Sequence, residues 1–330
     1  MADVAASAGV STALVSIVMR DAPGASAPTR ERVRAAAAEL GYRPDARARS
    51  LRRSRSHLLG VVFGLHHPFH ADLVEGVYAA AEPAGYGVVL SAVAPSRDER
   101  RAVESLLDDR CEALLLLGPE SPTARLAELG ARLPVVAVAR SVATDSVEVV
   151  RSGDADGAAQ AVDHLVGLGH RHIAHVDGGR APGAAERRRG YRAAMRRHGL
   201  ADREQLVPGG MSAADGAGAV PGLLAGAQAP TAVLAFNDEC ATGVLDALLR
   251  AGVPVPTGVS VVGFDDSHLA RLPHVDLTTV AQDARDMARL AVGKAVARLE
   301  GTEAGGREAV VPPRLVVRGT TAGPRKRLLL

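Results

Sequence analysis

The strongest constraint on the fold is an alternation of strand-length apolar runs with helical stretches from residue 58 onward. In the first series, strands are predicted at Leu59–Phe63, Gly87–Ala92, Ala113–Leu117 and Val135–Val138, and helices at Leu73–Ala84 and Arg97–Asp108. After a strand at Val147–Val150, the second series has helices at Asp156–Leu168, Glu186–His198 and Glu239–Arg250 and strands at Ile173–Val176, Ala232–Ala235 and Ser260–Gly263. Such alternation is typical of parallel, doubly wound sheets. Two series predict two α/β lobes, with a ligand cleft at the carboxyl ends of their strands.

Composition excludes several other classes of protein. The chain has 330 residues, 47% of them hydrophobic and 23% charged, which are ordinary values for a soluble globular protein. Its longest apolar runs have the length of a strand, well short of the roughly 20 residues that a membrane span needs. The N-terminus lacks the basic and apolar segments of an export signal, and two cysteines, Cys111 and Cys240, are too few for a disulfide framework. We therefore expect a cytoplasmic protein of two or more domains with no membrane partner.

The net charge of +2 hides an uneven distribution. Residues 1–57 contain ten arginines and five acidic residues, whereas the other 273 residues contain 29 basic and 32 acidic residues. A basic head on a mildly acidic body favours a polyanionic partner for the head alone. Arginine is the dominant basic residue throughout the chain, so the local excess of positive charge carries this inference.

The basic head has the pattern of three short helices. A helix is predicted over residues 3–8, and Gly9 after it can supply the positive φ of a tight turn. Ser11 is a good N-cap for a second helix that runs to about Met19. A third helix is predicted over about residues 28–40. Two short helices around a tight turn, with small polar residues at the exposed start of the second, describe a helix-turn-helix.

The stretch that follows the head, residues 45–55, is basic. It has too few apolar residues to form a core, and Leu51 is its only large apolar residue. By composition alone it is a linker with weak helix propensity, typical of a solvated tether between domains.

Three groups of residues occur in a fixed order in the head. They are Asp3-Val4-Ala5 with Ala8-Gly9-Val10-Ser11 and Val15-Ser16, then Thr29-Arg30-Glu31-Arg32-Val33, then Glu39-Leu40-Gly41-Tyr42-Arg43-Pro44. This ordered set resembles the lactose/galactose-repressor (LacI/GalR) family of bacterial transcription regulators. The resemblance implies that the second helix enters the major groove of DNA. It also implies that residues 45–51 form a hinge helix on the operator, with Leu51 wedged into the minor groove.

The helix faces and the resemblance together give the candidate DNA-binding residues. These are Ser11, Thr12, Ala13, Ser16, Ile17, Arg20, Thr29, Arg47, Ala48 and Leu51. The chain departs from the family's usual residues at Leu14, Ile17 and Arg20. Ile17 cannot form a bidentate contact with guanine, although it can pack on a thymine methyl group. The operator sequence of other members therefore does not transfer to this chain.

The resemblance extends over the body of the chain. The motifs that carry it are His164-Leu165 with Leu168-Gly169-His170-Arg171-His172-Ile173-Ala174, Ala235-Phe236-Asn237-Asp238, Ser260-Val261-Val262-Gly263-Phe264-Asp265-Asp266, Leu277-Thr278-Thr279-Val280 with Gln282, and Arg318-Gly319-Thr320-Thr321. They imply the fold of a periplasmic sugar-binding protein, in which the chain crosses three times between two lobes.

These observations together predict the domain organisation. We expect a helix-turn-helix domain at residues 1–44, a hinge helix and linker at 45–57, and an effector-binding and dimerisation domain at 58–330. Within that domain, the N-lobe is expected at about 58–151 and 284–311, and the C-lobe at about 152–281 and 312–325.

Seven residues are candidates for effector binding. They are Phe69, Arg140, Asp154, Arg187, Asn237, Asp265 and Asp266. Asn237, Asp265 and Asp266 follow predicted strands, where polar groups converge on a cleft, although an Asp after a strand is also a common turn or N-cap residue. Carboxylate, amide and guanidinium groups suit the hydroxyls of a sugar. The roles of Arg187, three residues before Gly190-Tyr191, and of Phe69 are implied by the resemblance.

Metal binding and enzymatic activity are not expected. His66, His67 and His70 lie close together, as do His170, His172 and His175, but neither cluster has a carboxylate or cysteine at convincing metal-ligand spacing. Residues 154–157 are similar to the start of a calcium loop, yet Leu165 occupies the position of its bidentate Glu. The glycine-rich nucleotide motifs and the Gly-x-Ser-x-Gly nucleophile motif are missing. We expect no metal and no cofactor.

The sequence is best interpreted as a ligand-responsive transcription regulator, expected to be a repressor. It would bind a pseudo-palindromic operator as a homodimer and respond to a small polar effector such as a sugar. The alternative is a solute-binding protein of the same fold, which the missing export signal and the basic head oppose. A sugar-active enzyme on this fold is opposed by the missing catalytic residues.

Overall fold

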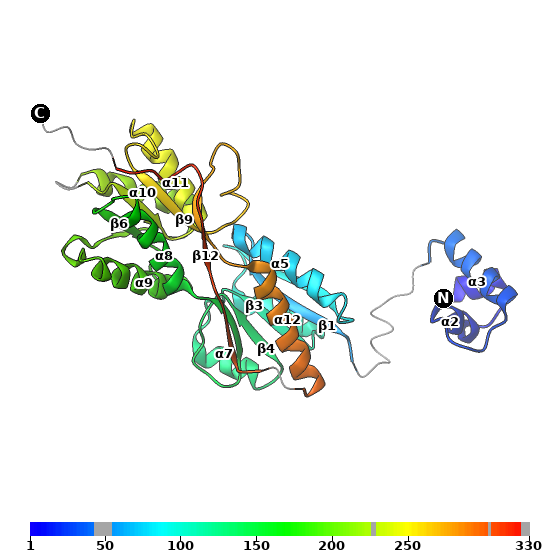
Figure 1. Ribbon diagram of the computed structural model, residues 1–330. Coiled ribbons are helices and arrows are strands. Elements are labelled where there is room, and N and C mark those ends of the chain that lie inside the picture. Colours follow the sequence, from blue (N-terminus) through cyan, green and yellow to red (C-terminus); the bar gives the residue numbers. More distant parts are fainter. Residues whose placement is uncertain (43–54, 226–228, 303–304, 325–330) are drawn as a thin grey trace, which may run out of the picture. The chain divides into compact units, whose positions relative to one another are not determined.

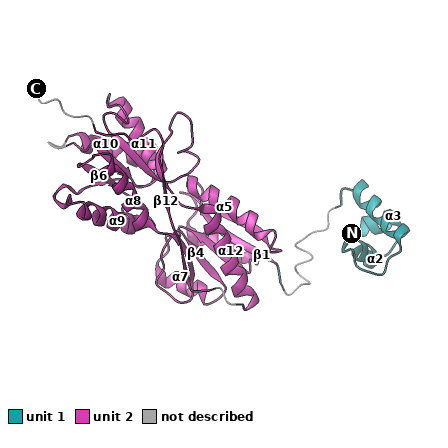
Figure 2. Ribbon diagram, viewed as in Figure 1, with its two compact units in different colours: residues 1–56 teal, residues 57–330 magenta. Residues whose placement is uncertain are grey.

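The computed structural model describes residues 1–42, 55–225, 229–302 and 305–324. The chain divides into two compact units, residues 1–56 and 57–330 (Figures 1 and 2). The first unit is built from helices, and the second contains two six-stranded sheets covered by helices. The predicted fold class, an all-α head followed by a two-lobed α/β body, is confirmed.

The head packs three helices around a small apolar core. They are α1 (Ala2–Ala8), α2 (Thr12–Met19) and α3 (Ala27–Glu39). Val4, Val15 and Val33 are buried at their centre. Gly9 ends α1 with a left-handed φ of 64°, and the Ser11 hydroxyl caps α2 by accepting a hydrogen bond from the amide of Leu14 at 3.2 Å. This turn and cap are the ones that the sequence predicts.

The N-lobe of the body is a parallel sheet with helices on both faces. Its strands are β1 (Leu58–Gly64), β2 (Gly87–Val93), β3 (Ala113–Leu117), β4 (Val135–Val138), β5 (Glu148–Ser152) and β11 (Glu308–Val311), in the order β11-β5-β4-β3-β1-β2. Helices α5 (Pro68–Ala81) and α12 (Ala284–Glu300) cover one face, and α6 (Glu99–Asp108) and α7 (Thr123–Gly130) cover the other. All five residues of β3 are buried, as expected for a strand covered on both sides.

The C-lobe repeats this arrangement. Its strands are β6 (Ile173–Asp177), β7 (Gln205–Pro208), β8 (Ala232–Ala235), β9 (Ser260–Asp265), β10 (Thr278–Ala281) and β12 (Arg314–Val316), in the order β12-β10-β9-β8-β6-β7. Helices α8 (Asp154–Gly167) and α9 (Ala184–Arg197) cover one face, and α10 (Ala213–Leu224) and α11 (Asp238–Arg250) the other. A short 3₁₀ turn, η1 (Ala201–Arg203), precedes β7. The edge strand β12 is antiparallel to β10, which departs from the purely parallel sheet of the prediction.

The chain passes between the two sheets three times. It leaves the N-lobe between β5 and α8, returns between β10 and α12, and leaves again between β11 and β12. These connections are short, so the ends of the two sheets lie close to one another at the crossings. Figure 1 shows the red C-terminal segment, which contains β11 and β12, running along the body from the N-lobe to the C-lobe.

Several elements differ from the sequence prediction. Helix α5 begins at Pro68 rather than Leu73, because proline is well suited to the first turn of a helix, and it ends three residues before the predicted Ala84. Strand β9 continues through Asp265, past the predicted end at Gly263. Among the residues that the structure describes, no single helix is long and apolar enough to cross a membrane. Helices α1 and α2 meet that criterion only as a pair bent by 97°.

Candidate ligand-binding site

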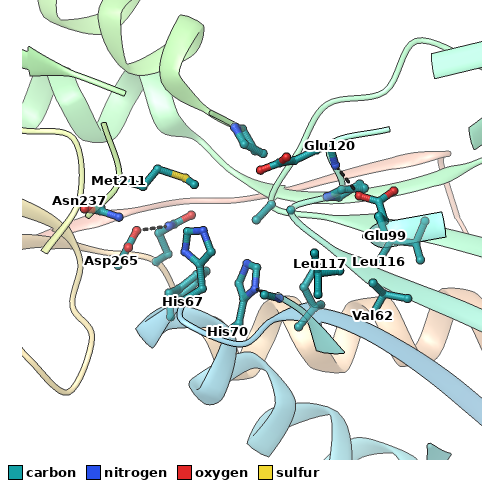
Figure 3. Close-up of a pocket in the computed structure, with 18 of the residues that line it drawn as sticks. Val62, His67, His70, Glu99, Leu116, Leu117, Glu120, Met211, Asn237 and Asp265 are labelled. Carbon is teal, nitrogen blue, oxygen red and sulfur yellow. Dashed lines mark hydrogen bonds between the residues drawn. The ribbon is translucent and has the colours of Figure 1, made fainter. Parts of the chain in front are cut away.

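A cavity of about 210 Å³ lies between the two lobes (Figure 3). Residues that follow or end strands of both sheets line it, together with the start of α5. The N-lobe supplies mainly Val62, Phe69, His67, His70, Leu116 and Leu117, and the C-lobe supplies mainly Arg187, Met211, Phe236, Asn237 and Asp265. Four of the seven predicted effector residues therefore line one cavity: Phe69, Arg187, Asn237 and Asp265.

Arg187 is the central cation of the site. Its Nε donates to Asp154 Oδ1 at 2.8 Å, and its Nη1 donates to the carbonyl oxygen of Phe236 at 2.7 Å. Its Nη2 lies 3.6 Å from Asp265 Oδ1, and its Cζ lies 3.7 Å from the centre of the Phe264 ring. The side chain is only 7% exposed. These contacts fix the plane of the guanidinium group and compensate for its burial.

The sequence of α9 brings Arg187 close to Asp154. A Cβ atom at Gly190 would overlap the carbonyl oxygen of Ala155, so glycine at this position allows α9 to pack closely on the start of α8. Burial raises the pKa of the Asp154 carboxyl, and the nearby Arg187 opposes that rise. Asp154 is not part of the cavity lining and holds Arg187 in place through the hydrogen bond that it accepts from Nε. Its predicted contact with an effector stays a prediction.

Asp265 ends β9 at the edge of the cavity. Its Oδ1 accepts a hydrogen bond from Gln282 Nε2 at 2.7 Å, and Gln282 lies in the connection that leads back to the N-lobe. The backbone of Asp265 has a φ of 114°, a strained value for a non-glycine residue. Burial raises the pKa of its carboxyl, and Arg187 opposes the rise. Asp265, like Arg187, is thus held in a fixed orientation by its neighbours.

Asn237 has two roles in the structure. Its side-chain oxygen caps α11 by accepting from the amide of Cys240 at 2.8 Å, and its side chain also lines the cavity. The cap explains why an Asn follows β8, since Asn is a favoured N-cap residue whether or not it binds a ligand. The remaining amide NH₂ is a donor at the cavity wall.

Two histidines at the start of α5 belong to the site and were not predicted as effector residues. His67 precedes the helix, and His70 lies in its first turn with 7% of its surface exposed. Their rings stack, with centroids 4.5 Å apart. From the sequence, these histidines were candidates only for metal ligands. The nearby candidate Phe69 could have indicated both histidines, because residues at the start of one helix lie close enough together to line the same cavity.

Arg140 and Asp266, like Asp154, lie outside the lining of this cavity. Arg140 donates to the carbonyl oxygens of Pro119 and Ser121 and lines a neighbouring hollow, and Asp266 accepts from Arg318 Nη2 at 2.6 Å. Both side chains are engaged in structural contacts. Their predicted contact with an effector stays a prediction.

His170 and His175 of the second cluster are buried and hydrogen bonded within the C-lobe. His170 hydrogen bonds to Thr231 Oγ1 at 2.9 Å and to the carbonyl oxygen of Ala322 at 2.8 Å. His175 is completely buried beneath the site. Within the described part of the chain, no group of three His, Cys, Asp or Glu residues is arranged to hold a metal ion.

Seven of the ten candidate DNA-binding residues lie on helices α2 and α3 of the head or next to the ends of α2. Thr12, Ala13 and Arg20 are exposed, and Ser16, Ile17 and Thr29 are half-buried. Ser11 is exposed, but its hydroxyl caps α2. Arg47, Ala48 and Leu51 lie outside the described residues. A row of exposed or partly exposed small and polar side chains at the start of α2 is the surface that a recognition helix needs.

Comparison with known proteins decides the family. Residues 1–45 match the model of bacterial regulatory proteins of the lacI family, and residues 162–321 match a periplasmic binding protein-like domain. The ribose operon repressor of Escherichia coli (strain K12) is 33% identical over 306 residues, which cover 91% of this chain and 92% of the relative. The chain belongs to the LacI family of bacterial transcription regulators. The resemblance inferred from the sequence is therefore confirmed.

Solved structures of LacI-family proteins agree with this assignment. A LacI transcriptional regulator from a Rhodococcus species is 52% identical, covers 81% of this chain and all of its own, and superposes with a TM-score of 0.79. The lac repressor dimer bound to operator and the anti-inducer ONPF is 30% identical, with a TM-score of 0.82 over 97% of this chain and 98% of its own. This LacI-family chain is a ligand-responsive repressor of transcription and not an enzyme. The match of residues 1–45 also counts against a pure solute-binding protein.

Proposed function

We propose that this repressor binds a pseudo-palindromic operator as a homodimer and responds to a sugar held in the cavity between its lobes. The convergence of Arg187, Asn237 and Asp265 on one cavity carries this proposal. A guanidinium, an amide NH₂ and a carboxylate provide donors and an acceptor at fixed positions, which suits adjacent hydroxyl groups. The apolar side chains opposite them, such as Leu116 and Leu117, suit the C–H face of a sugar ring.

The proposal divides the chain into three functional parts. Residues 1–44 bind the major groove, residues 45–57 form a hinge helix on the operator, and residues 58–330 bind the effector and dimerise. In the head, the contacts come from Ser11, Thr12, Ala13, Ser16, Ile17, Arg20 and Thr29, and in the hinge from Arg47, Ala48 and Leu51. The operator-bound dimer of the lac repressor supports this division for a protein of the same family.

Effector binding controls the operator through the lobes. A ligand that binds one arrangement of the two lobes more tightly shifts the population toward that arrangement. Because the chain enters the body at β1 of the N-lobe, a change in lobe arrangement is transmitted to the two hinge segments of a dimer. The sign of the response depends on which arrangement allows the two hinges to fold together on DNA.

The test is a thermal-shift screen of the full chain against D-ribose, D-glucose, D-galactose and cellobiose. Ribose is included because the 33%-identical relative is a ribose operon repressor. A sugar at 100 times its Kd should stabilise the folded body by about 2.7 kcal/mol. A positive sugar is then added to an operator titration, where it should change the affinity for DNA. If no sugar of the panel raises the melting temperature, the sugar class of the effector is wrong.

A further inference from the structure

The polar groups that line the cavity differ between the two lobes. Arg187, Asn237 and Asp265 all belong to the C-lobe, in α9, at the cap of α11 and at the end of β9. The N-lobe side of the lining carries the carboxylates of Asp98, Glu99 and Glu120, which are acceptors, and the rings of His67 and His70 at the start of α5 (Figure 3). A ligand oxygen that accepts a hydrogen bond from an N-lobe side chain of this cavity therefore depends on these histidines.

The structure fixes the tautomer of His70. The backbone amide of Gly64 donates to His70 Nδ1 at 2.9 Å. A backbone N–H can only donate, so Nδ1 must carry a lone pair and the proton of the neutral ring resides on Nε2. Burial of the ring lowers the pKa of His70 to about 3, with a further contribution from His67. The ring is therefore neutral, with one N–H donor, at any physiological pH.

The Nε2–H group of His70 has no hydrogen-bond partner among the residues that the structure describes, and it faces the cavity. A Cβ atom at Gly118 would lie 3.3 Å from Nε2, so glycine at this position keeps the approach to the nitrogen open. Gly118 also has a φ of 53°, in the left-handed region that favours glycine. Both glycine and histidine line the cavity. The stacked ring of His67 restricts the rotation of His70 on the other side.

We propose that His70 is the specificity-determining donor of the N-lobe, which selects an effector with an acceptor oxygen opposite Nε2 and links that oxygen to the C-lobe. The effector is then a ligand with a hydroxyl that donates to Asp265 and, at its other side, a hydroxyl, ring or carbonyl oxygen that accepts from His70. Such a ligand bridges the two lobes and stabilises them in the arrangement seen here. The inference rests on the proposed function, because it places the same effector in the same cavity.

The first experiment needs no ligand. The full chain is labelled with ¹⁵N-histidine, and long-range ¹H–¹⁵N spectra are recorded between pH 8 and pH 5. His70→Asn identifies the signals, because its side-chain oxygen takes the position of Nδ1 and keeps the hydrogen bond from Gly64. The expected result is a neutral ring protonated at Nε2 over the whole range. A ring protonated at Nδ1, or one that becomes cationic above pH 5, would overturn the proposal.

The second experiment measures binding of the four panel sugars by calorimetry. His70→Asn should weaken the sugar that binds the wild type about tenfold, because one hydrogen bond is lost and the sugar oxygen loses its partner. His70→Gln, whose amide nitrogen reaches the position of Nε2, should recover part of the affinity. His66→Asn changes an exposed histidine of the same loop, outside the cavity lining, and is the matched control.

The two experiments separate this inference from the proposed function. Unchanged sugar affinity in His70→Asn contradicts the role of His70 and leaves the sugar-responsive repressor intact. Absence of binding by every panel sugar contradicts the sugar class, and the histidine spectrum then decides whether His70 presents a fixed donor. Monodeoxy analogues of the binding sugar identify the oxygen that His70 contacts. The analogue that lacks this oxygen should bind the wild type more weakly than the parent sugar does, and it should bind the wild type and His70→Asn with equal affinity.

Discussion

The guanidinium of Arg271 lies 3.7 Å from the carboxylate of Asp72, measured from Nη2 to Oδ2, and this ion pair joins the two lobes. Arg271 belongs to the loop between β9 and β10 of the C-lobe, whereas Asp72 is on α5 of the N-lobe. The same helix carries Phe69 and His70 into the cavity. Residues that line the cavity and a residue that joins the lobes are thus only a few positions apart on one helix.

Breaking this ion pair should change effector affinity by a small amount. Arg271 is 54% exposed and Asp72 is 26% exposed, so the pair contributes at most about 1 kcal/mol. Arg271→Gln and Asp72→Asn should each change sugar affinity by no more than about fivefold, and the double variant should match either single one. The difference in sugar affinity between these variants and the wild type should vanish in high salt. Additive effects of the two substitutions in calorimetry would show that the residues do not act as a pair.

Removing the charge of Arg187 should destabilise the body strongly. The Asp154 carboxylate is only 5% exposed and loses its charged partner, and such a loss costs about 3–5 kcal/mol. Arg187→Met should therefore unfold at a lower urea concentration than the wild type. Adding Asp154→Asn to it should restore part of the stability, because the buried carboxylate is then neutral. Equal stability of Arg187→Met and wild type would contradict the role assigned to this pair.

A buried histidine should make the body less stable in mild acid. Burial lowers the pKa of His175 to about 4, and its Nδ1 is engaged with the carbonyl oxygen of Leu234 at 3.0 Å. Below pH 6.5 the unfolded chain binds a proton at this residue and the folded chain does not, so acid favours unfolding. Between pH 7 and pH 5 this histidine should account for about 2 kcal/mol of lost stability.

His175→Asn tests this expectation, because its amide nitrogen can still donate to Leu234. Stability is measured by urea unfolding at several pH values, with His66→Asn as the control. The raised pKa values of Asp154 and Asp265 act in the opposite direction, since folded carboxyls then bind protons more readily. They are present in all three proteins, so the difference in slope reports His175. If stability depends on pH with the same slope in His175→Asn and the wild type, His175 is not the source of the acid sensitivity.

Leu51→Ala should separate operator discrimination from effector binding. The proposed hinge inserts this side chain only into the minor groove, where an apolar wedge bends the duplex. The variant should lose most of its preference for operator over random DNA, while its affinity for the sugar stays the same. Parallel gel-shift and calorimetric titrations measure both. Equal losses in the two titrations would mean that Leu51 packs against the body instead.

Much of the fold was predictable because its signals are local. The apolar runs of β1, β3 and β4 are mostly or fully buried. Because a parallel strand covered on both faces is apolar at successive positions, such a strand can be recognised from a short continuous apolar run. Helix α10 has weaker signals, since it is rich in alanine and glycine and contains Pro221. The three-residue strand β12 has no pattern of its own and exists because it pairs with β10.

The site was predictable where the side chain follows directly from its place on a strand or helix. Asp265 ends β9 and Asn237 follows β8, whereas Arg187 occupies a position that the family resemblance specifies. His70 could not be recognised, because its role depends on the amide of Gly64 and on the open space at Gly118. Arg140 and Asp266 were also candidates from the sequence, and their effector contacts stay predictions. The carbonyl and guanidinium groups that their side chains contact could not be predicted, because these groups come from distant parts of the chain.

We propose above that a sugar bound beside Asp265 controls binding to an operator. The most direct test is a titration of the full chain with duplexes selected from a random library, with and without the sugar that stabilises it. The wild type should select an inverted repeat and change its affinity for it when the sugar is added. In Asp265→Ala the sugar affinity should fall on the order of 30- to 1000-fold, so the same sugar concentration should leave operator affinity unchanged. A folded Asp265→Ala protein that still responds to the sugar like the wild type would show that this site does not control operator binding.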